Sequence, residues 1–70
     1  MKVVRLKLKE QLASRGITQA KLVDDTGLAP NTVKAYYHED VIRADLRVIA
    51  RLCEYLECDI SDLMVLEDTE

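Results

Sequence analysis

The chain has 70 residues, of which 49% are hydrophobic and 33% are charged, and its formal net charge is −3. This length suits a single domain, residues 1–70, with a small core, and no apolar stretch is long enough to cross a membrane. The net negative charge argues against avid binding to DNA of any sequence, because such binding depends on neutralising phosphates.

The charge is unevenly divided along the chain. Residues 1–39 hold seven Lys or Arg against four acids, and residues 40–70 hold three Arg against nine acids, so the halves carry +3 and −6. Salt at physiological concentration screens charges beyond about 8 Å. A basic face can therefore approach DNA even though the whole chain is acidic.

The residues that support catalysis or metal binding are few. Cys53 and Cys58 are the only cysteines and His38 is the only histidine, which is too few for a four-ligand zinc site. No nucleophile and base pair, no phosphate-binding loop and no signal-peptide segment is present. We therefore expect no enzyme, no catalytic residue, no cofactor, no metal, no small-molecule substrate and no membrane partner, with the cytoplasm as the location. Cys53 should be a buried reduced thiol and Cys58 a half-exposed one.

The first elements follow from hydrophobic periodicity. Residues 2–8 alternate between apolar and charged side chains, which indicates a short strand. From Leu8 the spacing becomes helical through Leu12 and Ala13, and the helix should end at Arg15-Gly16, where a cation and a glycine follow each other.

Two short helices joined by a tight turn are predicted next, over residues 18–37. Thr18 is a suitable N-cap for the first, and Gly27 is a natural stop because glycine adopts left-handed backbone angles without steric cost. Pro30 suits the first position of the second helix, whose amide would be unpaired anyway. Val33 and Tyr36 should be buried in the core. So short a turn makes the helices pack at a steep angle, which is the helix-turn-helix geometry.

The remaining elements complete the chain. Asp45 should cap a helix whose apolar stripe is formed by Leu46, Ile49, Ala50, Cys53 and Leu56. Ser61-Asp62 can start a short helical turn that delivers Leu63, and residues 64–66 can form a terminal strand. The two terminal strands can pair within one chain or join two chains. We favour pairing within the chain, which leaves the sheet with a free edge.

The whole pattern resembles the Cro/CI-type (XRE-like) helix-turn-helix domain in its small stand-alone form. The resemblance is carried by Leu8, Leu12, Arg15-Gly16-Ile17, Thr18-Gln19, Leu22, Gly27-Leu28, Thr32-Val33, Tyr36, Leu46, Ile49 and Leu52-Cys53. It implies an all-α, lambda-repressor-like fold of five helices, with short terminal β-strands allowed. Two positions depart from the family pattern: Val23 stands where Ala is usual, and Ala29 replaces a Ser that caps the second motif helix.

Residues on the outside of that second helix are the candidates for DNA contact, because this helix enters the major groove in helix-turn-helix docking. Asn31 can contact adenine, Lys34 a guanine edge or a phosphate, and Ala35 a thymine methyl. The other candidates on this helix are Pro30, Thr32, Tyr37 and His38. In the preceding helix, Gln19 matches the family's phosphate-binding position, and Thr18 and Lys21 are further phosphate candidates.

Each candidate also has an ordinary structural interpretation. Asn31 and Thr32 are polar residue types that favour helix starts, and Lys34 can be a solvated surface lysine. Tyr37 is either a packing ring or a phosphate contact, and His38 can be a loop residue. The acids Asp24 and Asp25 are expected to face away from the DNA, since they would repel phosphate.

The sequence therefore predicts a DNA-binding transcriptional regulator, with repression as the expected action. It should insert the helix that starts at Pro30 into the major groove of double-stranded DNA, as a homodimer on a near-palindromic site. The alternative is a protein-interaction module, antitoxin-like or anti-repressor, that keeps the fold without binding DNA.

Overall fold

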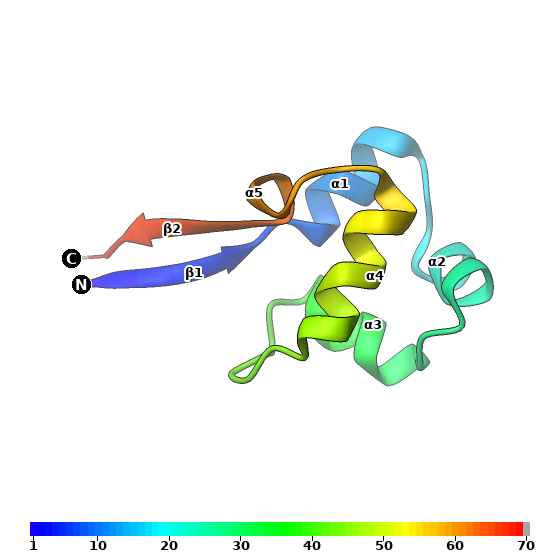
Figure 1. The fold of residues 1–70 in the computed structure, drawn as a ribbon, viewed down its shortest axis with the longest axis horizontal. Helices are drawn as coiled ribbons and strands as arrows, with labels where there is room; N and C mark the ends of the chain where they lie inside the picture. The colour runs from blue at the N-terminus through cyan, green and yellow to red at the C-terminus, as the bar shows by residue number, and fades with distance from the viewer. Residues whose placement is uncertain (70) are drawn as a thin grey trace.

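The structure is a computed structural model that describes residues 1–69. Figure 1 shows a cluster of helices with a two-stranded ribbon that extends to one side. The elements in chain order are β1 (Lys2–Leu6), α1 (Leu8–Arg15), α2 (Gln19–Thr26), α3 (Pro30–Tyr37), α4 (Leu46–Leu56), α5 (Ile60–Leu63) and β2 (Met64–Asp68). The prediction of five helices with short terminal strands is confirmed.

The ends of the first three helices are set by the residues that the sequence indicated. Gly16 and Gly27 follow α1 and α2 with φ of 65° and 74°, in the left-handed region that glycine adopts freely. Thr18 caps α2, since its hydroxyl oxygen accepts a hydrogen bond from the Lys21 N–H at 3.1 Å. Pro30 is at the start of α3. These local devices place the break between α2 and α3 at the predicted residues.

Helix α4 begins at the predicted cap but buries a different stripe. The Asp45 carboxylate accepts from the Arg47 N–H at 2.8 Å, and Ile49, Leu52 and Leu56 are the buried residues of the helix. Leu46 is 79% exposed and Ala50 is also exposed, so the predicted stripe is wrong at both positions. Helical spacing gives the direction in which a side chain points, but it does not show whether another element covers that side chain.

Both cysteines are free and half-buried, so Cys53 is less enclosed than expected, whereas Cys58 is as expected. Burial raises the pKa of the Cys53 thiol above its ordinary value. Ala13 is exposed, and α1 packs through Leu8 and Leu12.

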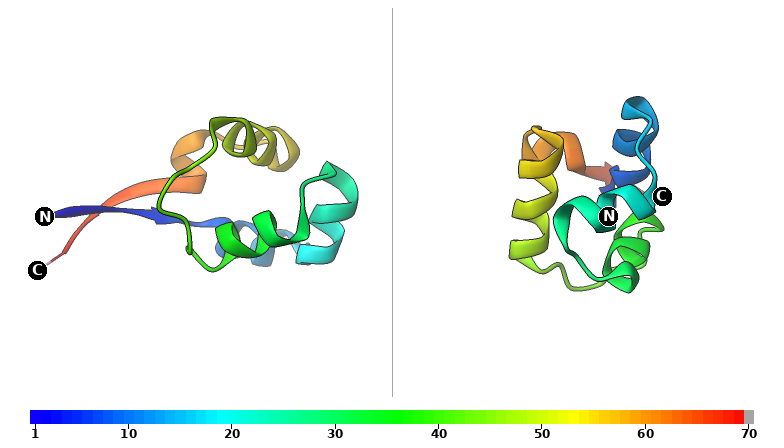
Figure 2. Two further views of the ribbon diagram at one scale, coloured as in Figure 1. Left: turned by 90° about the horizontal axis from the view of Figure 1, so that it is seen from below. Right: turned by 90° about the vertical axis from the view of Figure 1, so that its right-hand side faces the viewer.

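The short helix α5 and the strand β2 form the end of the described chain. The N-cap of α5 is Asp59, not the predicted Ser61-Asp62 start, and Asp59 forms a reciprocal capping box with Asp62. β2 then pairs antiparallel with β1 within the chain, as we favoured, with Val4 opposite Leu66 at the centre of the register. Figure 2 shows that this ribbon carries both termini away from the helices, and the molecule measures 38 × 22 × 17 Å.

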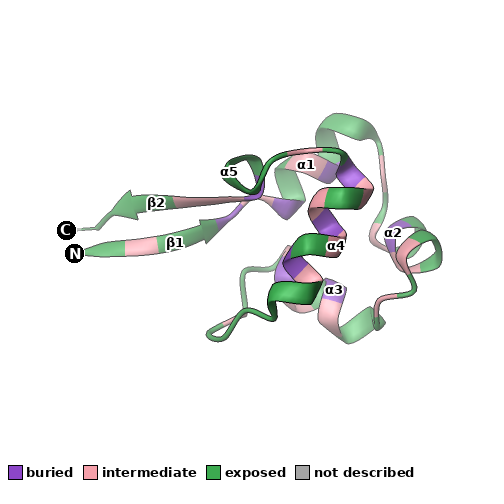
Figure 3. Ribbon diagram, viewed as in Figure 1, coloured by how far each residue is buried: buried purple, intermediate pink, exposed green. Residues whose placement is uncertain are grey.

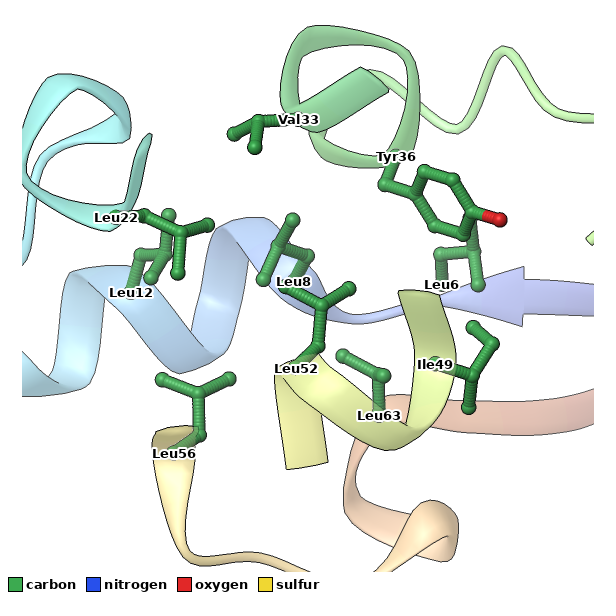
Figure 4. Packing of buried hydrophobic residues seen from close by; sticks show 10 residues of the cluster. All are labelled: Leu6, Leu8, Leu12, Leu22, Val33, Tyr36, Ile49, Leu52, Leu56 and Leu63. Carbon is green, nitrogen blue, oxygen red and sulfur yellow. The ribbon is translucent and has the colours of Figure 1, made fainter. Parts of the chain in front are cut away.

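The core lies between the helices and the inner end of the ribbon. Figure 3 marks where the buried residues lie along the ribbon, and Figure 4 shows their side chains pointing toward one another from every element except β2. Ten residues form the buried cluster: Leu6, Leu8, Leu12, Leu22, Val33, Tyr36, Ile49, Leu52, Leu56 and Leu63. Within residues 1–69, no helix has the length and apolar character that a membrane-spanning segment requires.

Candidate nucleic-acid interface

Helix α3 is held rigidly by its inner side. Val33 and Tyr36 are 1% and 5% exposed, which confirms the prediction that both belong to the core. The Tyr36 hydroxyl accepts a hydrogen bond from the Asp45 N–H at 2.9 Å, so it also ties α3 to the start of α4. Since a reading helix must keep its side chains in register with base edges, this double anchorage suits α3 to such a role.

The turn between α2 and α3 is braced by a residue that sequence reasoning missed. The Thr26 hydroxyl donates to the Leu22 carbonyl at 2.7 Å and accepts from the Leu28 N–H at 3.2 Å. One side chain thus links the last turn of α2 to the connection that leads into α3. A threonine just before the stop glycine was the available sequence signal, because its hydroxyl can bond the carbonyl four residues earlier.

The outer side of α3 presents the predicted residues to different extents. Pro30, Asn31, Lys34 and His38 are exposed, whereas Thr32, Ala35 and Tyr37 are half-buried. His38 is the C-cap residue of α3, and its ring lies edge-on to Tyr37 with centroids 5.0 Å apart. Ala29 is the N-cap, and it makes no side-chain cap hydrogen bond.

The candidates on α2 are arranged around its first turn. Thr18 is exposed, and its hydroxyl oxygen accepts the capping hydrogen bond. Gln19 is half-buried at the first position of the helix. Lys21 is exposed and forms an ion pair with Asp25 at 3.1 Å, so its charge is partly neutralised within the helix.

A shallow hollow lies between the outer sides of α2 and α3. Four of the predicted residues line it, namely Gln19, Pro30, Asn31 and Lys34. Ala20, Val23 and Asp24 complete the lining. The lining does not include the other predicted residues, which are Thr18, Lys21, Thr32, Ala35, Tyr37 and His38. The structure thus brings together Gln19 of α2 and two polar residues of α3, Asn31 and Lys34.

The two acids of α2 differ in their surroundings. Asp25 accepts a hydrogen bond from the Tyr55 hydroxyl of α4 and lies beside the Lys21 ammonium, and together they lower its carboxyl pKa. Asp24 lines the hollow with Asn31 and Lys34, so it lies on the same side of the molecule as two of the predicted contact residues. Helical geometry turns consecutive residues by about 100°, so adjacent acids cannot share one direction.

The segment after α3 adds two exposed cations that the sequence analysis did not consider. Arg43 lies in the loop that leads to α4, and Arg47 lies in the first turn of α4. The hydrogen bond between Tyr36 and the Asp45 N–H keeps this segment beside α3. Arginines flanking a predicted reading helix were the available signal for them.

The arrangement of α2, turn and α3 defines a helix-turn-helix protein whose second motif helix has an exposed, polar outer side. Comparison with known proteins makes the assignment narrower. The profile of the Cro/C1-type HTH DNA-binding domain matches residues 7–69, and the chain belongs to this family. Domains of this family typically bind DNA and carry no enzymatic activity.

A solved structure supports the same fold. A crystal structure of a protein from Bacteroides fragilis, described as a candidate DNA-binding protein, is similar with a TM-score of 0.77. The two sequences are 21% identical, and the similarity covers 90% of this chain and 100% of that one. No curated protein matches this chain in sequence.

Proposed function

We propose that this chain is a sequence-specific transcriptional regulator that acts as a repressor by inserting α3 into the major groove of double-stranded DNA. The observation that carries the proposal is the hollow where Gln19 of α2 meets Asn31 and Lys34 of α3. In helix-turn-helix docking, the start of the first motif helix binds the DNA backbone while the second reads the bases. In this proposal, residues 1–70 form one cytoplasmic domain with its motif at about 18–37.

Each residue near the hollow has a role that follows from its chemistry. The Asn31 amide can both donate and accept, which matches the major-groove edge of adenine. Lys34 donates to a guanine edge or to a phosphate, and the Ala35 methyl group can touch a thymine methyl. Gln19 would bind a phosphate at the start of α2, where the helix dipole also favours negative charge. Pro30 sets the direction in which α3 enters the groove.

The remaining candidates would contact the DNA backbone. Thr18, Lys21, Thr32, Tyr37 and His38 carry hydroxyl, ammonium or imidazole groups that can donate to phosphates. The Thr18 hydroxyl remains able to donate, since the cap uses only its acceptor oxygen. Arg47 adds a cation in the first turn of α4, next to the Asp45 N–H that is bonded to Tyr36 of α3.

The proposed regulator acts as a homodimer. One α3 can contact only a few base pairs, and two copies related by a two-fold axis would contact half-sites about one helical turn apart. A near-palindromic operator follows from this symmetry.

A second candidate function is a protein-interaction module that keeps the fold without binding DNA. It is favoured by Asp24 in the hollow and by the net charge of −3, because both repel phosphate. An antitoxin-like or anti-repressor partner would use the same exposed side of α2 and α3.

The experiment that separates the two is selection of duplexes from a random pool, followed by affinity measurements on the selected and on a scrambled sequence. Asn31→Ala should cost about 1–3 kcal/mol on the selected site only, whereas Gln19→Ala should weaken binding to both sequences equally. Lys34→Ala should reduce affinity, and Lys9→Ala on α1 is its matched control. Equal losses for Asn31→Ala on both sequences would remove it as a reader. Absence of duplex binding at about 50 mM salt, where screening is weak, would favour the interaction module.

A further inference from the structure

The hydrogen-bond register of the ribbon determines which backbone N–H and C=O groups point toward its outer edges. The Lys7 N–H donates to the Leu63 carbonyl at 2.7 Å, and the Thr69 N–H donates to the Met1 carbonyl at 2.8 Å. In an antiparallel ribbon, hydrogen-bonded and non-hydrogen-bonded residue pairs alternate. The residues of a non-hydrogen-bonded pair point their N–H and C=O groups toward the outer edges. Val4 and Leu66, which lie opposite each other, therefore point these groups toward the two outer edges.

The outer edge of β1 is partly covered. The Leu6 N–H points outward and donates to Glu39 Oε1 at 3.0 Å. The Glu39 carboxylate is itself held by the Arg5 guanidinium, with Nε to Oε1 at 2.8 Å. A charged side chain placed against a strand edge blocks pairing with another strand. β1 is therefore a poor edge for association.

The outer edge of β2 is open. The Met64 N–H is bonded to the Ile60 carbonyl at the end of α5. Beyond it, no hydrogen bond from residues 1–69 reaches the outward backbone groups of Leu66. In the part of the chain that the structure describes, the outer edge of β2 is therefore unpaired, although an isolated two-stranded sheet is at best marginally stable in water.

This edge is complementary to itself. If two β2 strands pair antiparallel about Leu66, the two Leu66 residues exchange N–H···O=C bonds. Each Asp68 N–H then reaches the Met64 carbonyl of the second copy, so the occupied Met64 N–H is not needed. Four interchain hydrogen bonds result.

The charges of β2 do not oppose this pairing. In the Leu66-centred register, Glu67 faces Val65 of the second copy, so no acid faces an acid directly. Both acids already have partners within the chain: Lys2 Nζ lies 2.9 Å from Asp68, and Arg5 lies 3.4 Å from Glu67. The acids of β2 are thus compensated within the chain, and its edge, unlike that of β1, has no side chain such as Glu39 placed against it.

Pairing would also extend an apolar row. Val4 and Leu66 are 54% and 65% exposed on one face of the ribbon, and pairing would align Val4, Leu66 and their counterparts across four strands. The accessible surface of 5063 Å² also exceeds the value of about 4500 Å² for a compact monomer of this mass. The ribbon that projects from the core accounts for this excess surface, part of which pairing with a second copy would cover.

From these observations we propose that the free edge of β2 is the interface with a second copy of this chain, which forms a four-stranded antiparallel sheet centred on the two Leu66 residues. The choice of a second copy rests partly on the proposed function, which needs a two-fold dimer to present two α3 helices. A small interface of this kind forms weak, reversible dimers.

Two proline variants test the proposal, because they make the same change on opposite edges. Leu66→Pro removes the outward N–H of β2, and Val4→Pro removes the outward N–H of β1, while neither N–H takes part in the pairing within the chain. Sedimentation equilibrium from about 10 µM to 1 mM spans the range expected for a small interface. The wild type and Val4→Pro should shift from 8.0 kDa to twice that mass, and Leu66→Pro should remain at 8.0 kDa.

Amide hydrogen exchange on the wild type provides a measurement that needs no variant to fold. The Leu66 amide should exchange at least tenfold more slowly at high than at low protein concentration, whereas the Val4 amide should exchange equally fast at both. A wild type that stays monomeric, a dimer that survives Leu66→Pro, or a dimer lost in Val4→Pro would each overturn the proposal.

Because both measurements are made without DNA, they are independent of the proposed function. A dimer through β2 that binds no duplex would leave the interface standing and refute the regulator. A monomer that selects a single half-site would refute the interface and leave sequence-specific DNA binding standing.

Discussion

Asp24 provides a sharp test of how α2 and α3 face DNA, because its carboxylate lines the hollow with Asn31 and Lys34. If this hollow faces the duplex, the carboxylate lies near phosphates and weakens binding to every sequence. Asp24→Asn removes the charge and keeps the size of the side chain. We therefore expect the variant to bind DNA more tightly, without a change in sequence preference.

The size of the effect follows from Coulomb's law. One phosphate at about 8 Å in water repels a unit negative charge by about 0.5 kcal/mol, so two facing phosphates contribute about 1 kcal/mol. Screening leaves about three quarters of this energy at about 0.01 M salt and roughly a third at about 0.15 M. Affinity should therefore rise about fourfold at low salt and about twofold or less at physiological salt.

The assay is fluorescence anisotropy with a labelled duplex of mixed sequence, titrated at both salt concentrations. Glu10→Gln is the matched control, because Glu10 is an exposed acid on α1 that does not line the hollow. A gain in Asp24→Asn that exceeds the gain in Glu10→Gln at low salt supports the docking. Equal gains in the two variants, or none in Asp24→Asn, would show that the hollow does not face the duplex.

Two further predictions concern stability. The Arg5 guanidinium and the Leu6 N–H lower the pKa of Glu39 from 4.5 to about 2; the carboxylate therefore stabilises the fold above pH 4.5 and loses this contribution as the pH falls toward 2. Urea unfolding across this range should show Glu39→Gln to be less stable than the wild type near neutral pH and equal to it near pH 2, and a pH-independent difference would contradict the assignment. Ala29→Ser supplies the missing side-chain cap of α3 and should raise the free energy of unfolding by about 1 kcal/mol, whereas Ala20→Ser within α2 should not; an unchanged or lower unfolding midpoint in Ala29→Ser would contradict this.

The sequence predicted those parts of the candidate site that depend on neighbouring residues. The Thr18 cap, the left-handed Gly27 and the Pro30 start act within one helical turn, so residue type alone places the motif. The burial of Val33 and Tyr36 followed from helical spacing because other elements cover the whole inner side of α3. Gln19, Asn31 and Lys34 were then brought together by the motif itself.

Contacts between residues distant in the chain could not be predicted in this way. Helical geometry turns the adjacent Asp24 and Asp25 in different directions, but only the packing of α4 places Tyr55 beside Asp25, and only the packing of α3 forms the hollow that Asp24 lines. Leu46 was assigned to the core by its spacing, but its side chain is largely exposed. Such differences depend on where whole helices come to lie, and periodicity within one helix carries no information about that.

The sequence by itself determined the class of fold, because caps, stop glycines and apolar spacing act locally and each favours the same helices. The tertiary structure decided the properties of the surface. It placed Glu39 against the edge of β1, 33 residues from its hydrogen-bond donor Leu6, and it left the edge of β2 open. Both features depend on how distant segments pack together, and no local interaction within the chain specifies that packing.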